Sequence, residues 1–322
     1  MTTAAEVPNV AICVPTFQRP DDLSRLLSLL PATIAAAQRS GRAGRVDVIV
    51  IDNDPSAGAR DVARAAPIAC RYAVEAERGV VAVRNRALDE SADADVLVFI
   101  DDDETPADEQ WLSRLLSAWR TYDAQAVAGP VRTVADDPLD SWIVAGEFFA
   151  RAHRARLGTG DGIARAATNN LLLDMRFVRR EALRFDPRFA RSGGEDSLFT
   201  SQLHRRGGRM VWCAEAGVLD HLPAQRRTRE HALRRTRGMA TVGVTVALAL
   251  ADSPAARARV RIKAVVAGVG RWAGGVARVI AGGLLRSERL DAIGRRECAR
   301  GTGSLEGALN RSPELYGGGG DR

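Results

Sequence analysis

Four acidic side chains end an apolar run in the segment DVLVFIDDDETP, residues 95–106: Asp101, Asp102, Asp103 and Glu104. Like charges repel, so this crowding indicates that a ligand or ion attracted to negative charge binds here. Carboxylate oxygens at a strand end suit Mg²⁺ or Mn²⁺, which keep several waters and bridge phosphate oxygens. On an extended backbone Asp101 and Asp103 point the same way and Asp102 the opposite way. We therefore expect Asp101 and Asp103 to share one divalent cation.

Two other interpretations of this run are open. The stretch TPADEQW (105–111) suits a capped helix entry, although a cap does not account for three consecutive aspartates. The stretch FIDDDET (99–105) also fits the D-x-D-x-T motif of haloacid-dehalogenase-type phosphatases. That chemistry needs a lysine beside the phosphoaspartate, and the chain has a single lysine, Lys263.

A second acidic pair lies in RSGGEDSLF, residues 191–199. The two glycines permit a tight backbone approach, and Glu195 and Asp196 then open a predicted helix, EDSLFTSQLHRR. A carboxylate in this position can take a proton from an attacking hydroxyl. The structural alternative is a pair of first-turn acids that complement the helix dipole.

The elements that must position these acids alternate along the chain. Strands are expected at 10–17, 46–52, 69–75, 95–100 and 126–131, and helices at 20–30, 57–66, 80–91 and 108–122. In the first helix, Leu23, Leu26, Leu27 and Leu30 form an apolar stripe. Repeated β-α units predict an α/β fold with a mainly parallel sheet and helices on both faces. Ligands of such sheets bind beyond the carboxyl ends of the strands, where these polar residues lie.

In this order the motifs resemble the family 2 glycosyltransferases, in particular the bacterial exopolysaccharide (succinoglycan-type) branch. The matching pieces are VPTFQRP, VIDND, ERGVVAVRNRAL, FIDDDE, WLSRLL, AVAGPV, TNNLLL, GGEDSLF and RGGRMVWCAEAGVLDH, which cover about residues 9–222. The resemblance implies a GT-A (Rossmann-like) fold, a nucleotide-sugar donor, a divalent cation (Mn²⁺ or Mg²⁺) and inversion at the anomeric carbon.

The resemblance also implies roles for individual residues. Asp101 and Asp103 would hold the metal, with His221 completing its shell or contacting the diphosphate, unless that histidine is structural. Asp196 would be the catalytic base, and Glu195 would orient or bind the acceptor. The nucleotide sugar would lie against residues from several loops: Pro15, Thr16, Arg19, Asp52, Asp54, Arg78, Arg84, Asn85, Asp102, Asn169 and Asn170.

Two of these donor assignments carry their own physical arguments. Asp52 would accept a hydrogen bond from a uracil-type N–H, which favours a UDP-linked sugar. Arg84 would offer a guanidinium fork to the diphosphate, and its alternative is a solvated helix face. Thr168, Asn169 and Asn170 match a segment near the donor sugar in which the family often has glycine at the middle position.

Composition bounds the remaining choices. A chain of 322 residues with 46% hydrophobic and 27% charged residues predicts a globular protein. The four cysteines form no metal-binding or disulfide pattern, and the segment MTTAAEVPNV lacks the features of a signal peptide. We therefore expect a cytoplasmic protein with reduced thiols. We also expect a catalytic domain at 1–222, a basic helical extension at 223–310 and a disordered tail at 311–322.

The extension is strongly basic, with six arginines in QRRTREHALRRTRG (225–238). The apolar run 262–285 carries Lys263, Arg271 and Arg278, which spoil a membrane span but lie near one helix face. The region 225–285 indicates either peripheral attachment to anionic lipid on the inner face of the plasma membrane or packing on the catalytic domain. Nucleic-acid binding is not expected, because no aromatic-rich binding module accompanies the arginines.

No P-loop, dinucleotide-binding or nucleophile-elbow motif is present in the sequence. The sequence thus predicts an inverting, metal-dependent hexosyl- or other glycosyltransferase that acts on a glycan or lipid-linked acceptor in cell-surface polysaccharide or glycolipid synthesis. The alternatives are the phosphatase and a binding protein that keeps the fold without turnover.

Overall fold

The computed structural model describes residues 7–150, 154–190 and 192–311. The chain divides into two compact units. The sheet unit comprises residues 7–132, 154–190 and 195–221, and the helical unit comprises residues 133–150, 192–194 and 222–311. Residues 133–150, which precede the domain boundary predicted at 222, group with the helical unit. The tail predicted to be disordered, 311–322, lies outside the described residues apart from Arg311.

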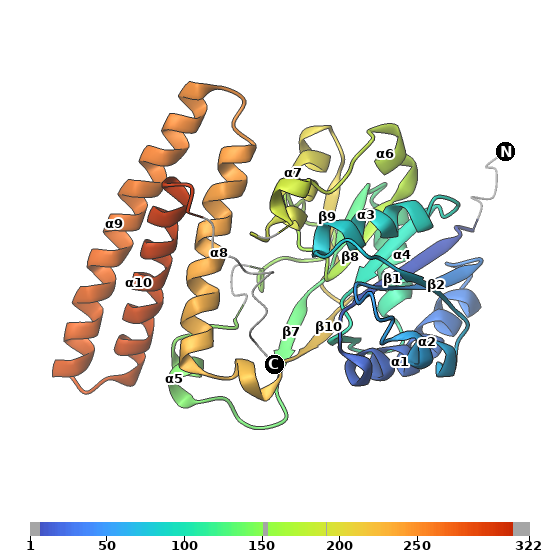
Figure 1. Cartoon of the computed structure of the whole chain (residues 1–322), viewed down its shortest axis with the longest axis horizontal. Coiled ribbons are helices and arrows are strands. Elements are labelled where there is room, and N and C mark those ends of the chain that lie inside the picture. Colours follow the sequence, from blue (N-terminus) through green and yellow to red (C-terminus); the bar gives the residue numbers. More distant parts are fainter. Residues whose placement is uncertain (1–6, 151–153, 191, 312–322) are drawn as a thin grey trace. The chain divides into compact units, whose positions relative to one another are not determined.

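The sheet unit is built on a seven-stranded sheet of order β3-β2-β1-β4-β8-β6-β9 (Figure 1). Its strands are β1 (Val10–Thr16), β2 (Val46–Asp52), β3 (Cys70–Val74), β4 (Val96–Ile100), β6 (Ala126–Ala128), β8 (Asn170–Asp174) and β9 (Met210–Trp212). Strands β1 to β4 are parallel, as are β6 and β9, whereas β8 runs antiparallel to both β4 and β6. The predicted α/β fold with a mainly parallel sheet is confirmed.

Helices cover both faces of this sheet because alternate strand residues point to opposite sides. Val10, Ile12 and Val14 of β1 pack in one core with residues of α1 (Pro20–Arg39), α2 (Arg60–Ala65) and α4 (Trp111–Thr121). Ala11 and Cys13 pack in the other core with α3 (Val80–Glu90), α6 (Met175–Arg180) and α7 (Glu195–Arg205). A short 3₁₀ helix, η1 (Pro187–Phe189), precedes α7. The four predicted leucines of α1 are fully buried.

One predicted strand is wrong. The stretch 126–131 was expected to be continuous, but β6 ends at Ala128 and β7 (Val131–Val134) joins a second sheet of order β5-β10-β7. Gly129 lies at the break, where a Cβ would stand 2.0 Å from the carbonyl oxygen of Ala216. The small sheet also contains β5 (Glu104–Pro106) and β10 (Val218–His221), which pair antiparallel.

The helical unit contains α5 (Ser141–Ala145), the 3₁₀ helix η2 (Ala224–Arg226), α8 (Arg229–Ala249), α9 (Pro254–Leu284) and α10 (Glu288–Ala308). Each long helix begins after a side-chain cap. The hydroxyls of Thr228, Ser253 and Ser287 accept hydrogen bonds from backbone N–H groups in the first turns of α8, α9 and α10. The helical character predicted for this region is present in the structure.

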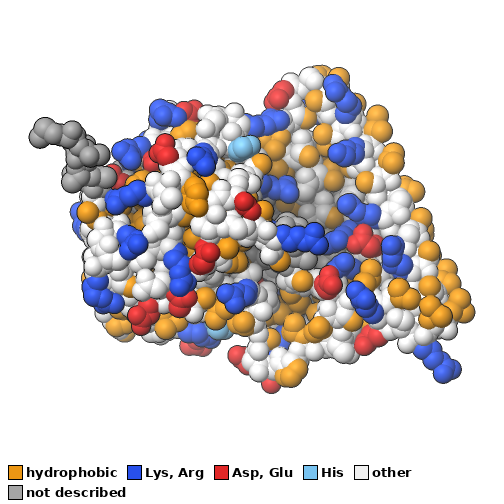
Figure 2. All heavy atoms as spheres, turned by 180° about the vertical axis from the view of Figure 1, so that it is seen from behind, with side chains coloured by type: hydrophobic (Ala, Val, Ile, Leu, Met, Phe, Trp, Pro, Cys, Tyr) orange, Lys and Arg blue, Asp and Glu red, His pale blue; other side chains and the backbone are white. Residues whose placement is uncertain are grey.

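Helices α9 and α10 approach each other through small residues. A Cβ at Gly275 would lie 2.7 Å from the carbonyl oxygen of Gly294, and one at Gly301 would lie 2.6 Å from that of Gly268. The only buried residues of α9 are Ala264, Gly268, Gly275 and Gly282, so its large apolar side chains lie at the surface. Figure 2 shows hydrophobic side chains along the helical unit at the right of the view.

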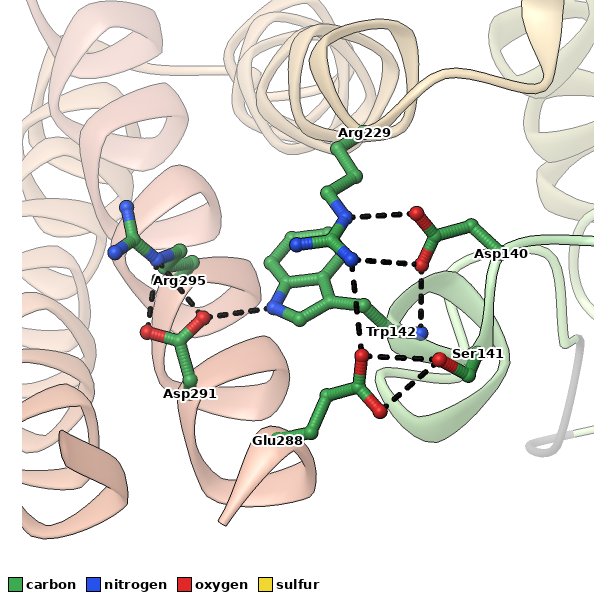
Figure 3. A network of polar contacts seen from close by, with 7 residues as sticks. All are labelled: Asp140, Ser141, Trp142, Arg229, Glu288, Asp291 and Arg295. Atoms are coloured by element: carbon green, nitrogen blue, oxygen red, sulfur yellow. Dashed lines mark hydrogen bonds and ion pairs between the residues drawn. The ribbon is translucent and has the colours of Figure 1, made fainter. Parts of the chain in front are cut away.

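A polar network joins α5 to α8 and α10 (Figure 3). Arg229 pairs with both oxygens of Asp140 at 2.9 and 3.0 Å, and its guanidinium lies 5.1 Å from the ring centre of Trp142. The buried Trp142 donates from Nε1 to Asp291 at 2.7 Å. Because each partner lies on a different helix, this network fixes α5 within the helical unit.

Candidate functional site

The acidic run 101–104 makes a turn, so the extended backbone expected there is wrong. Strand β4 ends at Ile100, and the Glu104 N–H donates to the Asp101 carbonyl oxygen at 3.1 Å. Glu104 then starts β5. The turn changes which side chains converge, because Asp102 and Asp103 meet on the same side instead of alternating.

Arg19 binds the two central aspartates. Its Nη1 donates to Asp102 at 3.1 Å and to Asp103 at 2.6 Å, and the Thr16 hydroxyl donates to Asp102 at 2.8 Å. Thr16 ends β1, and Arg19 immediately precedes α1, so the loop after β1 meets the loop after β4 at the sheet edge. Pro15 lies one residue earlier in β1 and is half-buried. The structure thus brings the first-loop residues to the acidic run, as the sequence predicted.

Burial shapes the electrostatics of this run. Burial raises the pKa of Asp101 to about 7, opposed by the positive charge of Arg84 and reinforced by Asp103 and Asp102. Burial likewise raises the pKa of Asp102 to about 6, opposed by Arg19. Among the described residues, the Asp101 carboxylate accepts no hydrogen bond. A cation bound beside these buried carboxyls would favour their ionised form.

Glu104 belongs to the same site, although it was not assigned a role from the sequence. It is 2% exposed, its Oε1 accepts a hydrogen bond from Asn169 at 2.5 Å, and its Oε2 has no partner among the described residues. Burial, with Asp101 and Asp103 nearby, raises its pKa well above the ordinary value. The hydroxyl of the buried Thr168, which precedes Asn169 in the sequence, also has no hydrogen-bond partner among the described residues. Membership in a run of four acids was the only sequence signal for Glu104.

The loop after β2 is organised by its own polar residues. Asp52 accepts from the N–H groups of Asp54 and Ala59 and from the Tyr72 hydroxyl at 2.6 Å. Asn53, which the sequence did not single out, bridges to the carbonyls of Glu75 and Glu77 and to the Gly79 N–H. Asp52 is therefore engaged by the protein, and its predicted contact with the base stays a prediction.

Two further residues of this edge differ in exposure, because Asp54 is buried at 8% whereas Arg78 lies at the surface. Asp54 accepts from the Ser56 N–H at 2.9 Å, and hydrogen bonds from Ser56 lower its pKa. Arg78 is exposed, with its guanidinium 5.1 Å from the ring centre of Phe17. The loops after β1, β2 and β3 thus contribute polar groups along the carboxyl edge of the sheet.

Arg84 does not lie on a solvated helix face. It is 7% exposed, and its Nη1 donates to Oε1 of Glu195, which is itself buried. The other oxygen of Glu195 has no hydrogen-bond partner among the described residues. Burial raises the pKa of Glu195, and the Arg84 charge opposes that increase. Because Arg84 is also the first opposing charge at Asp101, one guanidinium acts on both acidic groups.

Asp196 is the more accessible acid of its pair. Gly193 and Gly194 both have positive φ, 71° and 92°, and the chain then enters α7 at Glu195. Asp196 is half-buried, and its Oδ1 accepts from the Ser197 N–H. The predicted helix at this pair is present, with Glu195 turned inward to Arg84.

Three predicted site residues are bound to the protein itself. Asn85 exchanges hydrogen bonds with the backbone N–H and C=O of Phe185, both at 2.9 Å. Asn170 accepts from the Trp111 indole and donates to the carbonyls of Pro130 and Ala216, which leaves no free N–H for a sugar hydroxyl. His221 Nε2 lies 2.9 Å from the Thr105 hydroxyl.

The acidic run fits a divalent cation by its chemistry. Asp101 and Asp103 supply the hard oxygen donors that Mg²⁺ and Mn²⁺ prefer, and such ions take one or two carboxylates plus phosphate oxygens. Glu104 adds a buried oxygen without a partner. Across the described parts of the chain, no three His, Cys, Asp or Glu side chains form a ready-made metal cluster. Asp101, Asp103 and His221 therefore do not make a closed three-ligand set in this structure.

Comparisons with known proteins establish the class. The model of the glycosyl transferase family 2 matches residues 11–183. The succinoglycan biosynthesis protein ExoM of Rhizobium meliloti (strain 1021) is 33% identical over 225 residues, which are 69% of each chain. The chain belongs to the family 2 glycosyltransferases, in the exopolysaccharide branch. The phosphatase interpretation is therefore set aside.

Solved structures show the same fold. A mannosyltransferase from Pyrobaculum calidifontis, in complex with GDP-Man and Mn²⁺, aligns with a TM-score of 0.63 and 16% identity, covering 95% of this chain and 88% of that one. The TarS protein of S. aureus aligns with a TM-score of 0.50 and 12% identity, covering 90% and 55%. The predicted GT-A fold is confirmed.

Proposed function

We propose that this glycosyltransferase is metal-dependent and inverting, and that it moves a sugar from a nucleoside-diphosphate donor to an acceptor hydroxyl. The observation that carries the proposal is the arrangement around Arg84. This buried guanidinium binds Glu195 beside Asp196 and acts electrostatically on Asp101 at the end of β4. The two acidic groups needed for such a reaction are thus coupled through one side chain.

The run 101–104 is assigned to the donor. Asp101 and Asp103 would hold Mn²⁺ or Mg²⁺, which neutralises a diphosphate leaving group when bound. Arg19 and Thr16 fix Asp102 and Asp103, so the carboxylates keep their position before a ligand arrives. Asn169, held against Glu104, offers polar groups for the donor sugar.

The α7 pair is assigned to the acceptor. Asp196 takes the proton of the acceptor hydroxyl while that oxygen bonds to the anomeric carbon and the carbon–oxygen bond to the diphosphate breaks. One displacement of this kind inverts the configuration. Arg84 holds Glu195 in the interior, which leaves Asp196 as the acid nearer solvent.

The proposal extends to the nucleotide base of the donor and to the class of acceptor. The contact predicted for Asp52 is with a uracil base, and hence with a UDP-linked donor, whereas the Pyrobaculum neighbour was solved with GDP-Man. The acceptor is proposed to be a glycan or a lipid-linked saccharide. All four cysteines are free in the structure, which fits the cytoplasmic location that we propose.

The test is a release assay with a panel of UDP-, GDP- and dTDP-sugars, with Mn²⁺ and with a chelator. We expect one donor to release its nucleoside diphosphate only with the metal, and proton NMR of the transferred sugar to show inversion. Asp61→Asn, an exposed acid on α2, serves as the matched control for Asp103→Asn. Full turnover by Asp103→Asn, or retention of configuration, would contradict the proposal.

A further inference from the structure

Helix α9 buries small residues and exposes large apolar ones, which is the opposite of what a helix in the core of a soluble protein does. Its buried residues are all alanine or glycine. Most of its large apolar side chains are exposed, including Val266 at 68% and Leu284 at 81%. The full set of exposed large apolar residues in this region is Ile262, Val265, Val266, Val269, Trp272, Ile280, Leu284 and Leu285.

These side chains form one face instead of a scatter. Ile262, Val265, Val266 and Val269 recur at helical spacing, and Trp272 and Ile280 continue the same side. Of the large apolar residues exposed across the described chain, most lie between 262 and 285. Contiguous exposed apolar surface on a soluble protein marks an interaction site. We call this surface the α9 face.

The charge of the helix indicates what covers the α9 face. Between Ser253 and Ser287 the sequence has no acidic residue. Six cations lie on α9: Arg257, Arg259, Arg261, Lys263, Arg271 and Arg278. The side chains of the first four make no hydrogen bond or ion pair with any described residue. A second copy of this face would bring like charges together, whereas an anionic surface would neutralise them.

The partner helix excludes a membrane span. By length and composition α9 is the one described helix that could cross a bilayer, although the sequence had predicted none. Its close packing on α10 decides against this, because Gly275 lies against Gly294. Helix α10 carries Glu288, Arg289, Asp291, Arg295, Arg296, Glu297, Arg300 and Glu306. Burying that helix in hydrocarbon together with α9 would be strongly unfavourable.

We propose that the α9 face docks on the surface of an anionic phospholipid bilayer, with its apolar side chains among the acyl chains and its cations at the headgroups. This is the arrangement of an interfacial amphipathic helix, in which apolar burial and attraction to anionic lipid add together. It makes the protein peripheral. The docking is independent of the assignment of the catalytic residues.

The test is cosedimentation of the full chain with phosphatidylcholine vesicles, with and without about one third phosphatidylglycerol, at two salt concentrations. The wild type should pellet with the anionic vesicles, and less so at high salt. The variant Ile262→Ser/Val266→Ser/Val269→Ser should lose at least about tenfold in apparent affinity, as should Arg259→Gln/Lys263→Gln. Leu29→Ser and Met239→Ser, exposed residues of α1 and α8, are the matched controls.

Trp272 supplies a second readout that does not depend on sedimentation. It is 49% exposed, so its emission should shift to the blue with anionic vesicles, and Trp272→Phe should abolish the shift. Wild-type protein that stays in the supernatant, or that binds neutral vesicles equally well, would overturn the proposal. So would a serine variant that pellets like the wild type, melts at a lower temperature without lipid, or converts a solution dimer to a monomer.

Discussion

Two regions of the sheet unit hold carboxylates close together, and each uses an arginine differently. At the end of β4, Arg19 is partly exposed and pairs with Asp102 and Asp103, so a ligand can reach the pair. At the start of α7, Arg84 and Glu195 are both buried, while Asp196 lies next to them nearer solvent. We therefore expect a bound cation to be able to replace the first arginine, and we expect the second to be a fixed part of the fold.

Because of this difference, substitutions in the two regions should have different effects on stability and on ligand binding. A partly exposed pair contributes little to stability, whereas breaking a buried pair leaves an uncompensated charge. Changes at the β4 end should therefore alter ligand binding, and changes at Arg84 should alter folding. The predictions below test that division from the largest expected effect to the smallest.

The largest effect is expected for Asp196→Asn. Losing a general base lowers turnover by about 10²- to 10⁴-fold, while nucleotide affinity should change little because Asp196 lies outside the acidic run. Steady-state rates and calorimetric binding separate the two quantities. If Glu195→Gln lost as much turnover with no loss of stability while Asp196→Asn stayed active, the roles within the pair would be reversed.

Arg84→Met should destabilise the protein by about 3–5 kcal/mol, because Glu195 would remain buried without its partner. The measurement is urea unfolding of the wild type and the variant at equal protein concentration. The double variant Arg84→Met/Glu195→Gln should recover much of that loss, since it removes both charges. A single variant as stable as the wild type would show that the pair is not a fixed element.

Arg19→Gln should strengthen Mn²⁺ binding in the absence of nucleotide by about tenfold. Its guanidinium competes for Asp103, and removing it leaves the carboxylates to the ion. Titration of Mn²⁺ followed by electron paramagnetic resonance measures the affinity. Arg25→Gln, which removes a surface pair with Asp22, is the control and should have no effect. If Arg19→Gln bound Mn²⁺ with the affinity of the wild type, Asp103 would not be a ligand of the ion.

The smallest effect is expected for Glu104→Gln, which should raise Tm at pH 8. Burial raises the pKa of Glu104 in the folded protein. At a pH above the ordinary glutamate pKa, the carboxyl therefore ionises more readily in the unfolded chain than in the folded one. The free energy of unfolding thus falls as pH rises. Glutamine removes that dependence and can still accept from Asn169. The gain should shrink toward pH 4, where the carboxyl is protonated in both states. A gain that does not depend on pH would argue for packing instead.

The sequence predicted features that depend on local pattern. The leucine stripe of α1 and the alternation of strands with helices both follow from periodicity, and the structure has them. The helix entry at Glu195 was predicted from the same local signals. The acidic run lies, as predicted, at the carboxyl edge of the sheet, where the ends of parallel strands converge.

What the sequence missed depends on contacts between distant residues. Arg84 was predicted to bind the diphosphate or to lie on a solvated helix face, and no local pattern revealed its pairing with Glu195, which is 111 positions away. The turn at Asp102 and Asp103 leads into β5, where Glu104 pairs with Asp220 of β10, and no local pattern reveals that pairing. On α9 the small residues are buried and most of the large apolar ones are exposed. This distribution likewise depends on close packing against the glycines of α10.

The central claim is that the end of β4 is a metal-dependent nucleotide site. Calorimetric titration of UDP and GDP, with and without Mn²⁺, tests it on the wild type, Asp103→Asn and the control Asp61→Asn. The account predicts that one nucleotide binds the wild type and the control only with the ion, and that Asp103→Asn loses that binding. Equal binding by Asp103→Asn, or binding that ignores the ion, would contradict it.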